Sequence, residues 1–191
     1  MKKMIASIVL LTTIALQTMF SKNEAKNFAS MVSVNTSKDS ISNKDPLHMI
    51  TSAYLNLKNA LTKDDEKAAN IAANELFKAI EKFPATPLSK EQQTIWTKYS
   101  EKLTSDAEHI KGSSELEHQR KHFIELSKNM FSVIEAFKTN TITLYYQFCP
   151  MANEGKGAYW ISTEQKINNP YFGKKMATCG STKKTILSTI K

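Results

Sequence analysis

Apolar side chains recur every three or four positions between residues 46 and 137, which is the spacing of one face of an α-helix. Acidic residues, prolines and a glycine divide this pattern into four stretches. The pattern therefore predicts four helices, at about 46–61, 64–83, 89–112 and 114–137. The apolar positions that define them include Ile50, Tyr54, Leu57, Ile71, Leu76, Ile80, Ile95, Leu103, Ile110, Phe123, Leu126, Met130 and Ile134.

Polar residues at the start of these stretches support the same division. Asp45-Pro46 supplies a helix cap and a proline at the first helical position. Ser89 with Gln92, and Ser114 with Glu117, have the spacing of capping boxes. Four amphipathic helices of similar length with short connections predict a mainly α fold, an antiparallel four-helix bundle.

The character of the chain changes after Asn140. Residues 141–148 alternate between polar and apolar side chains, which predicts a strand or extended segment. Glycine, proline and aromatic residues dominate from Cys149 onward. We therefore expect a single domain over residues 45–191, in which an extended and irregular tail, 141–191, packs on the helical bundle.

The first residues have the pattern of a targeting segment. Two lysines follow Met1, and an uncharged apolar stretch runs from Ile5 to Met19. We interpret residues 1–25 as a signal peptide and residues 26–44, rich in Ser, Asn and Lys, as a flexible linker. The mature protein is then periplasmic with no membrane span; an uncleaved N-terminal anchor is the alternative.

Charge and motif content favour some function classes over others. The formal net charge is +8, but the lysines are dispersed among acidic residues, and no arginine cluster alternates with aromatics, so nucleic-acid binding is not expected. The chain has no GxSxG, phosphate-binding glycine loop or HExxH motif. A nucleophile pair of Cys149 and His122 has no accompanying oxyanion-hole signal. We therefore expect a protein that is not an enzyme.

Sulfur-bearing residues cluster in two short turns of the tail. Cys149 and Met151 flank Pro150, and Met176 and Cys179 precede Gly180. Thiolate and thioether sulfur are soft ligands suited to Cu(I). Two other readings remain open: the methionines fill gaps in the core, and the two cysteines of an exported chain form one structural disulfide.

Two histidines also have metal-ligand spacing. His118 and His122 are four residues apart, so they share one face of the predicted fourth helix. Two imidazoles at this spacing can bind one metal ion, and two Cys with two His would also satisfy tetrahedral zinc. The alternative is a polar helix flank, since residues 118–122 are all hydrophilic. His48 and His109 are weaker candidates.

Several longer runs of sequence are distinctive when they are taken together. They are LNLKNAL at 55–61, QRKHF at 119–123, YQFCPMA at 146–152, GAYWIS at 157–162, INNPYFG at 167–173 and MATCG at 176–180. These runs resemble one known family, and the resemblance covers about residues 48–186. The family is an uncharacterised exported helical domain that occurs alone and at the C-terminal end of CusB-type periplasmic adaptors of heavy-metal efflux pumps.

The resemblance implies handling of a soft metal, with copper favoured and zinc an alternative. It places Cys149, Met151, Met176, Cys179 and His122 in the site, and spacing adds His118. The first hypothesis is a periplasmic copper-binding carrier or accessory module that works with an efflux adaptor or pump. The second is a protein–protein interaction module whose tail is held by a Cys149–Cys179 disulfide.

Overall fold

The computed structural model describes residues 45–84 and 88–189. The predicted signal peptide and linker, residues 1–44, lie outside this part of the chain. Within it the structure is mainly helical, with a small antiparallel sheet at the C-terminal end.

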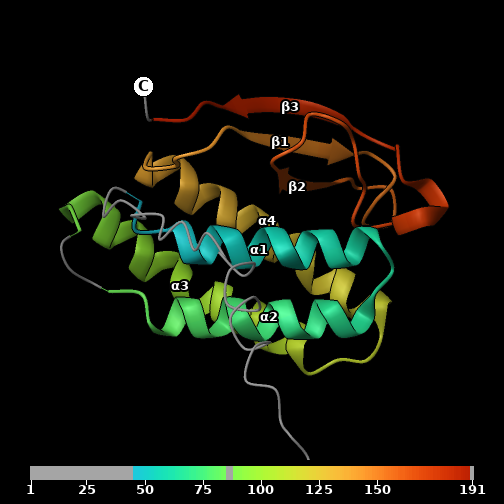
Figure 1. Ribbon diagram of the computed structural model, residues 1–191, viewed down its shortest axis with the longest axis horizontal. Helices are drawn as coiled ribbons and strands as arrows, with labels where there is room; N and C mark the ends of the chain where they lie inside the picture. Colours follow the sequence, from blue (N-terminus) through green and yellow to red (C-terminus); the bar gives the residue numbers. More distant parts are fainter. Residues whose placement is uncertain (1–44, 85–87, 190–191) are drawn as a thin grey trace, which may run out of the picture. The chain divides into compact units, whose positions relative to one another are not determined.

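Four helices form, close to the predicted stretches. They are α1 (His48–Thr62), α2 (Glu66–Glu81), α3 (Lys90–Lys111) and α4 (Leu116–Phe137), and successive helices run in opposite directions (Figure 1). Each helix packs along its neighbour in the sequence, as expected for a helical bundle. In the described residues no helix combines the length and the apolar character needed to cross a bilayer.

The helix ends agree with the sequence prediction in part. The capping box of α3 is present: the Ser89 hydroxyl accepts the Gln92 backbone N–H at 3.2 Å, and the Gln92 side-chain Oε1 accepts the Ser89 backbone N–H at 3.0 Å. The box predicted from Ser114 is wrong. Glu115 is the N-cap of α4 and makes no capping bond, while the Ser113 hydroxyl accepts the Glu115 N–H at 3.1 Å.

The tail is more regular than the sequence predicted. The expected extended segment forms β1 (Leu144–Cys149), and two further strands, β2 (Ala158–Ser162) and β3 (Ser181–Ile186), pair with it in antiparallel fashion. The order is β2-β1-β3, so β1 has a partner on both edges. A short 3₁₀ turn, η1 (Gly173–Met176), precedes β3. The prediction of an irregular segment after Cys149 is therefore wrong for β2 and β3.

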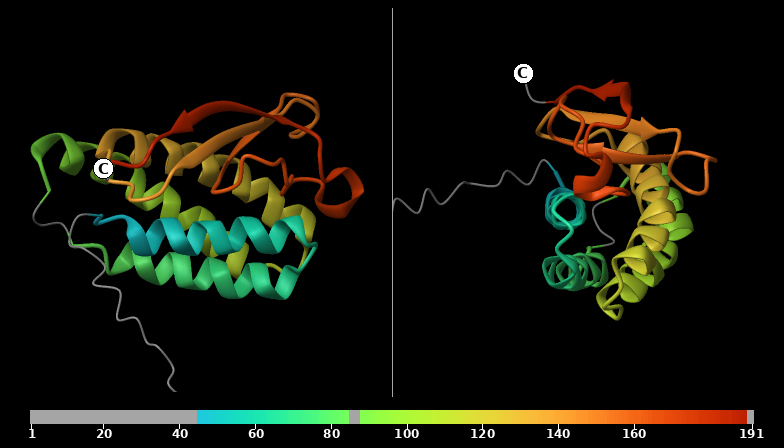
Figure 2. Two further views of the ribbon diagram at one scale, coloured as in Figure 1. Left: turned by 45° about the horizontal axis from the view of Figure 1, so that its top comes forward. Right: turned by 90° about the vertical axis from the view of Figure 1, so that its right-hand side faces the viewer.

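The sheet closes the side of the bundle where α1 and α4 lie. Strand β2 contacts both helices, and Figure 2 shows the sheet lying across them. Buried Tyr54 of α1 joins the three elements: its hydroxyl accepts the Ile161 N–H at 3.0 Å and shares a hydrogen bond of 2.8 Å with Ser127 of α4. The tail is thus part of the protein core rather than an appendage to it.

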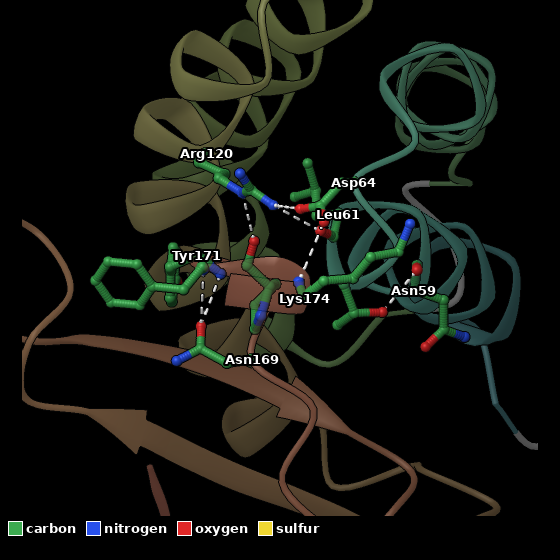
Figure 3. A network of polar contacts seen from close by, with 10 residues as sticks. Asn59, Leu61, Asp64, Arg120, Asn169, Tyr171 and Lys174 are labelled. Atoms are coloured by element: carbon green, nitrogen blue, oxygen red, sulfur yellow. Dashed lines mark hydrogen bonds and ion pairs between the residues drawn. The ribbon is translucent and has the colours of Figure 1, made fainter. Parts of the chain in front are cut away.

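A polar junction anchors the 3₁₀ turn to the helices (Figure 3). Arg120 of α4 donates to the carbonyl oxygens of Pro170 at 2.8 Å and Leu61 at 3.0 Å, and to the Asp64 carboxylate at 2.5 Å. Asp64 also accepts the Lys174 backbone N–H at 3.1 Å. The hydrogen bond from Arg120 holds the pKa of Asp64 below its usual value of 3.8.

The Asp64→Asn variant should therefore reveal an acid-dependent contribution to stability. The pKa of Asp64 is lower in the folded chain than in the unfolded one. The ionised carboxylate therefore contributes its full stabilisation of the fold above about pH 3.8, and this contribution is lost as the pH falls through the pKa of the folded chain. We expect the variant to be less stable than the parent near neutral pH and the difference to shrink in acid. Urea unfolding between about pH 7 and about pH 2 measures it. The Glu154→Gln variant, altered in an exposed loop, is the control, and its stability difference from the parent should not change with pH in this way.

Candidate functional site: a buried dithiol and a separate histidine cluster

The register of the sheet brings the two cysteines together. Cys149 is the last residue of β1, and its neighbour Phe148 is paired with Ser181 of β3. Cys179, two residues before Ser181, therefore lies beside Cys149 just beyond the end of the strand pair. The two sulfur atoms are 2.8 Å apart, as free thiols. Cys149 is fully buried and Cys179 is half-buried.

A glycine and an asparagine hold this arrangement. Gly180 has φ of +139°, and a Cβ atom there would lie 2.8 Å from the Phe148 carbonyl oxygen and 2.9 Å from the Trp160 ring. The chain can therefore approach β1 this closely because residue 180 has no side chain. Buried Asn169 donates to the Cys179 carbonyl oxygen at 2.8 Å, while its own side-chain oxygen accepts the Tyr171 N–H at 2.8 Å.

The thiol pair can undergo two kinds of chemistry. The hydrogen bond with Cys149, together with partial burial, raises the pKa of Cys179, which favours the protonated thiol over the thiolate. A disulfide requires the sulfurs to approach to about 2.05 Å. Two thiolates on one tetrahedral ion lie roughly 3.8 Å apart. The observed separation falls between these distances, so a small movement leads to either state.

The two methionines lie in the turns next to the cysteines but differ in exposure. The Met151 side chain, in the hairpin loop between β1 and β2, is 56 % exposed. Met176 ends the 3₁₀ turn and is half-buried. Its carbonyl oxygen accepts the Cys179 N–H at 3.1 Å, which closes the turn that carries the cysteine. Both thioethers thus belong to the segments that shape the dithiol.

The predicted histidine pair lies elsewhere, with a third histidine. His118 and His122 are one turn apart on α4, and His109, in the last turn of α3, lies opposite them. The His122 ring centroid is 4.3 Å from that of His109 and 4.7 Å from that of His118. One possible ligand atom from each of the three lies within 4.8 Å of those of the other two. His109 is exposed and His122 is half-buried.

The structure does not bring these histidines to the cysteines. Within the described residues, the group of three or more potential metal ligands that lie close together consists of these three histidines. Neither cysteine belongs to this group. The reason is the helical turn of about 100° per residue. Arg120, between the two histidines in sequence, faces Pro170 and the tail, so His118 and His122 face α3. The predicted combination of two Cys with two His is not assembled.

Sequence reasoning gave too little weight to His109 and missed Asp106. His109 is separated from His118 by a helix end and a turn, so no short motif links them. Asp106, one turn before His109 on α3, has a carboxylate oxygen 3.2 Å from His122 Nδ1. Burial raises the pKa of Asp106, while the bond to His122 opposes that shift. A signal was available in the spacing of three residues between Asp106 and His109.

Comparisons with known proteins match the helical part of the chain. The family profile described as "Protein of unknown function (DUF3347)" matches residues 50–141, from α1 to the end of α4 and just beyond. No curated protein and no solved structure matches. The three histidines lie inside the matched range, whereas both cysteines lie beyond it.

Proposed function

We propose that the protein binds a soft metal ion through Cys149 and Cys179, with Cu(I) as the preferred ion. The observation that carries this proposal is the 2.8 Å separation of the two sulfur atoms, which come from turns thirty residues apart in sequence. Two converging thiols form a minimal soft-ion site, since thiolates select Cu(I). The raised pKa of Cys179 argues against a role as an activated thiolate nucleophile.

The biological setting of this proposal rests on the sequence resemblance. A helical domain similar to those found alone or fused to CusB-type adaptors suits a periplasmic carrier or an accessory module of a heavy-metal efflux system. Such a module must release its ion to a partner. Met151, two residues after Cys149, has an exposed side chain, and Cys179 is only half-buried, so the ion would have a route between the dithiol and the surface. The partner would be an efflux adaptor or pump.

A second candidate function uses the same pair of cysteines. In an oxidising compartment the pair would close to a disulfide that joins the β1–β2 hairpin to the start of β3. The closed loop of about thirty residues would contribute about 3 kcal/mol. The stabilised sheet would then present a binding surface for another protein. Tyr159, 37 % exposed, is stacked against Tyr146 with ring centroids 4.6 Å apart and would lie at its centre.

Native mass spectrometry of the full chain, reduced and titrated with Cu(I), tests the first candidate. We expect one tightly bound Cu(I) in the parent and none in the Cys149→Ser/Cys179→Ser variant, because the hydroxyl is a hard, weak ligand. The Met49→Ala variant is the matched control: it removes a thioether that is 66 % exposed on α1, outside the tail, and should bind as the parent does. Equal copper uptake by the double-serine variant would rule out the dithiol site.

A thiol count on protein taken directly from the cell separates the two candidates. Alkylation in denaturant, which exposes the buried Cys149, without prior reduction should modify both cysteines if the pair serves as a metal site that has been stripped of its ion. It should modify neither if the pair is a disulfide. In the second case, adding a reductant should lower the free energy of unfolding by about 3 kcal/mol.

A further inference from the structure

We propose that His109, His118 and His122 form a second metal site that binds a borderline divalent ion of the Zn(II) or Cu(II) class, independently of the dithiol. Three of the four histidines in the sequence gather here, from two helices. Possible ligand atoms within 4.8 Å of one another need to approach by at most about 1.5 Å to share a tetrahedral ion, since zinc–nitrogen bonds are about 2.0–2.1 Å. The site does not depend on the proposed role of the cysteines.

Asp106 gives this cluster a feature that a merely polar helix flank lacks. Its carboxylate oxygen lies 3.2 Å from His122 Nδ1, so an imidazole that carries its proton on Nδ1 donates it to Asp106, and the lone pair of Nε2 is then available to a metal ion. Metal-bound histidines are characteristically oriented in this way by a carboxylate. The side chain of Asp106 is 15 % exposed, so this partner is held in place by its surroundings.

The helices supply a rigid frame for the three ligands. α3 and α4 pack along each other, and the turn between them is held by Gln119, which is fully buried. The Gln119 side-chain amide donates to the Ser113 carbonyl oxygen at 2.9 Å and to that of Glu66 at 3.1 Å. His118, the residue before Gln119, is therefore fixed relative to the end of α3 that carries His109.

The choice of ion follows from the ligands. Imidazole nitrogen without thiolate suits Zn(II), Cu(II) and Ni(II) rather than Cu(I). Three protein ligands leave one position of a tetrahedral ion open. An open hollow lies beside His109 and His118 and is lined also by Glu108, Ser113 and Glu115. Two acidic side chains at its edge favour a cation, and the opening allows the ion to exchange.

Titration of the full chain with Co(II), followed by absorption spectroscopy, distinguishes this site from the dithiol. Co(II) on imidazole nitrogen gives weak visible bands, whereas Co(II) on thiolate adds intense near-ultraviolet charge-transfer bands. We expect the visible bands without charge transfer at the first equivalent, and the same result in the Cys149→Ser/Cys179→Ser variant. Thiolate bands alone at the first equivalent, or no stoichiometric Co(II), would overturn the proposal.

Variants identify the ligands in a parallel Zn(II) titration by calorimetry. The His109→Ala, His118→Ala and His122→Ala variants should each weaken binding at least ~100-fold, beyond the upper range expected for loss of an outer partner. His48→Ala, which removes the fourth histidine, is the matched control and should bind as the parent does. Unchanged affinity in all three cluster variants would exclude this site, and circular dichroism checks that each variant folds.

Asp106→Asn tests the positioning role of the carboxylate. It should weaken Zn(II) binding by roughly 10- to 100-fold. In ¹⁵N NMR spectra of the histidine rings, it should also reduce the preference of His122 for the Nδ1-protonated form, a change that a purely structural residue would not cause. An unaltered ring spectrum together with unaltered affinity would contradict the proposed role of Asp106.

Discussion

Replacing Arg120 with Met is expected to lower the free energy of unfolding by about 2–4 kcal/mol, because a charged donor is removed from three acceptors at once. The Arg120 guanidinium donates hydrogen bonds to the Pro170 carbonyl, the Leu61 carbonyl and the Asp64 carboxylate, and the Arg120 side chain is 18 % exposed. The junction has no spare room: a Cβ atom on Gly173, where φ is +53°, would lie 1.8 Å from the Asp64 carboxylate. Urea unfolding gives the loss directly.

Two further variants define what the junction requires. Lys121→Met, at the neighbouring exposed position of α4, is the matched control and should change stability by less than about 0.5 kcal/mol. Arg120→Lys keeps the charge but cannot reach several acceptors with a rigid fork, so we expect it to recover only part of the loss. A loss for Arg120→Met no greater than that for Lys121→Met would show that the junction does not anchor the tail.

The second large effect is expected from Trp160→Ala, which should cost about 3–5 kcal/mol. Trp160, in β2, is fully buried and contacts Tyr171 edge to face, with ring centroids 6.0 Å apart. Its ring also lies against Gly180, where an added Cβ atom would be 2.9 Å from it. The variant should therefore loosen Cys179 as well as the core, so alkylation of the reduced protein should become faster.

The adjacent residue provides the comparison for this prediction. Tyr159 points to the other face of β2 and is 37 % exposed; its ring stacks on Tyr146 and contacts Phe148 at a tilt of 42°. Its replacement by Ala should cost about 1 kcal/mol, the size of an aromatic-pair contribution, and should leave thiol reactivity unchanged. Equal losses in the two variants would mean that the sheet does not bury its face against α1 and α4 as described.

The agreement between sequence and structure is best where the interactions are local. The helices follow from apolar spacing, and the capping box of α3 follows from Ser89 and Gln92, because both depend on residues a few positions apart. The box predicted at Ser114 failed because the turn after Gly112 placed Glu115 at the N-cap instead. Strand β3 carries no apolar alternation; it is an exposed edge strand defined by its pairing with β1.

The candidate sites show the same division between features that short-range spacing predicts and features that depend on tertiary packing. The sequence by itself identified the two sulfur-bearing turns around Cys149 and Cys179 and the face shared by His118 and His122, since residue type and short spacing determine both. The tertiary structure alone decided that the two sulfurs meet, because this depends on the register between β1 and β3. It also separated the histidines from the cysteines and gave them His109 and Asp106, because the packing of α3 against α4 joins residues that no local pattern connects.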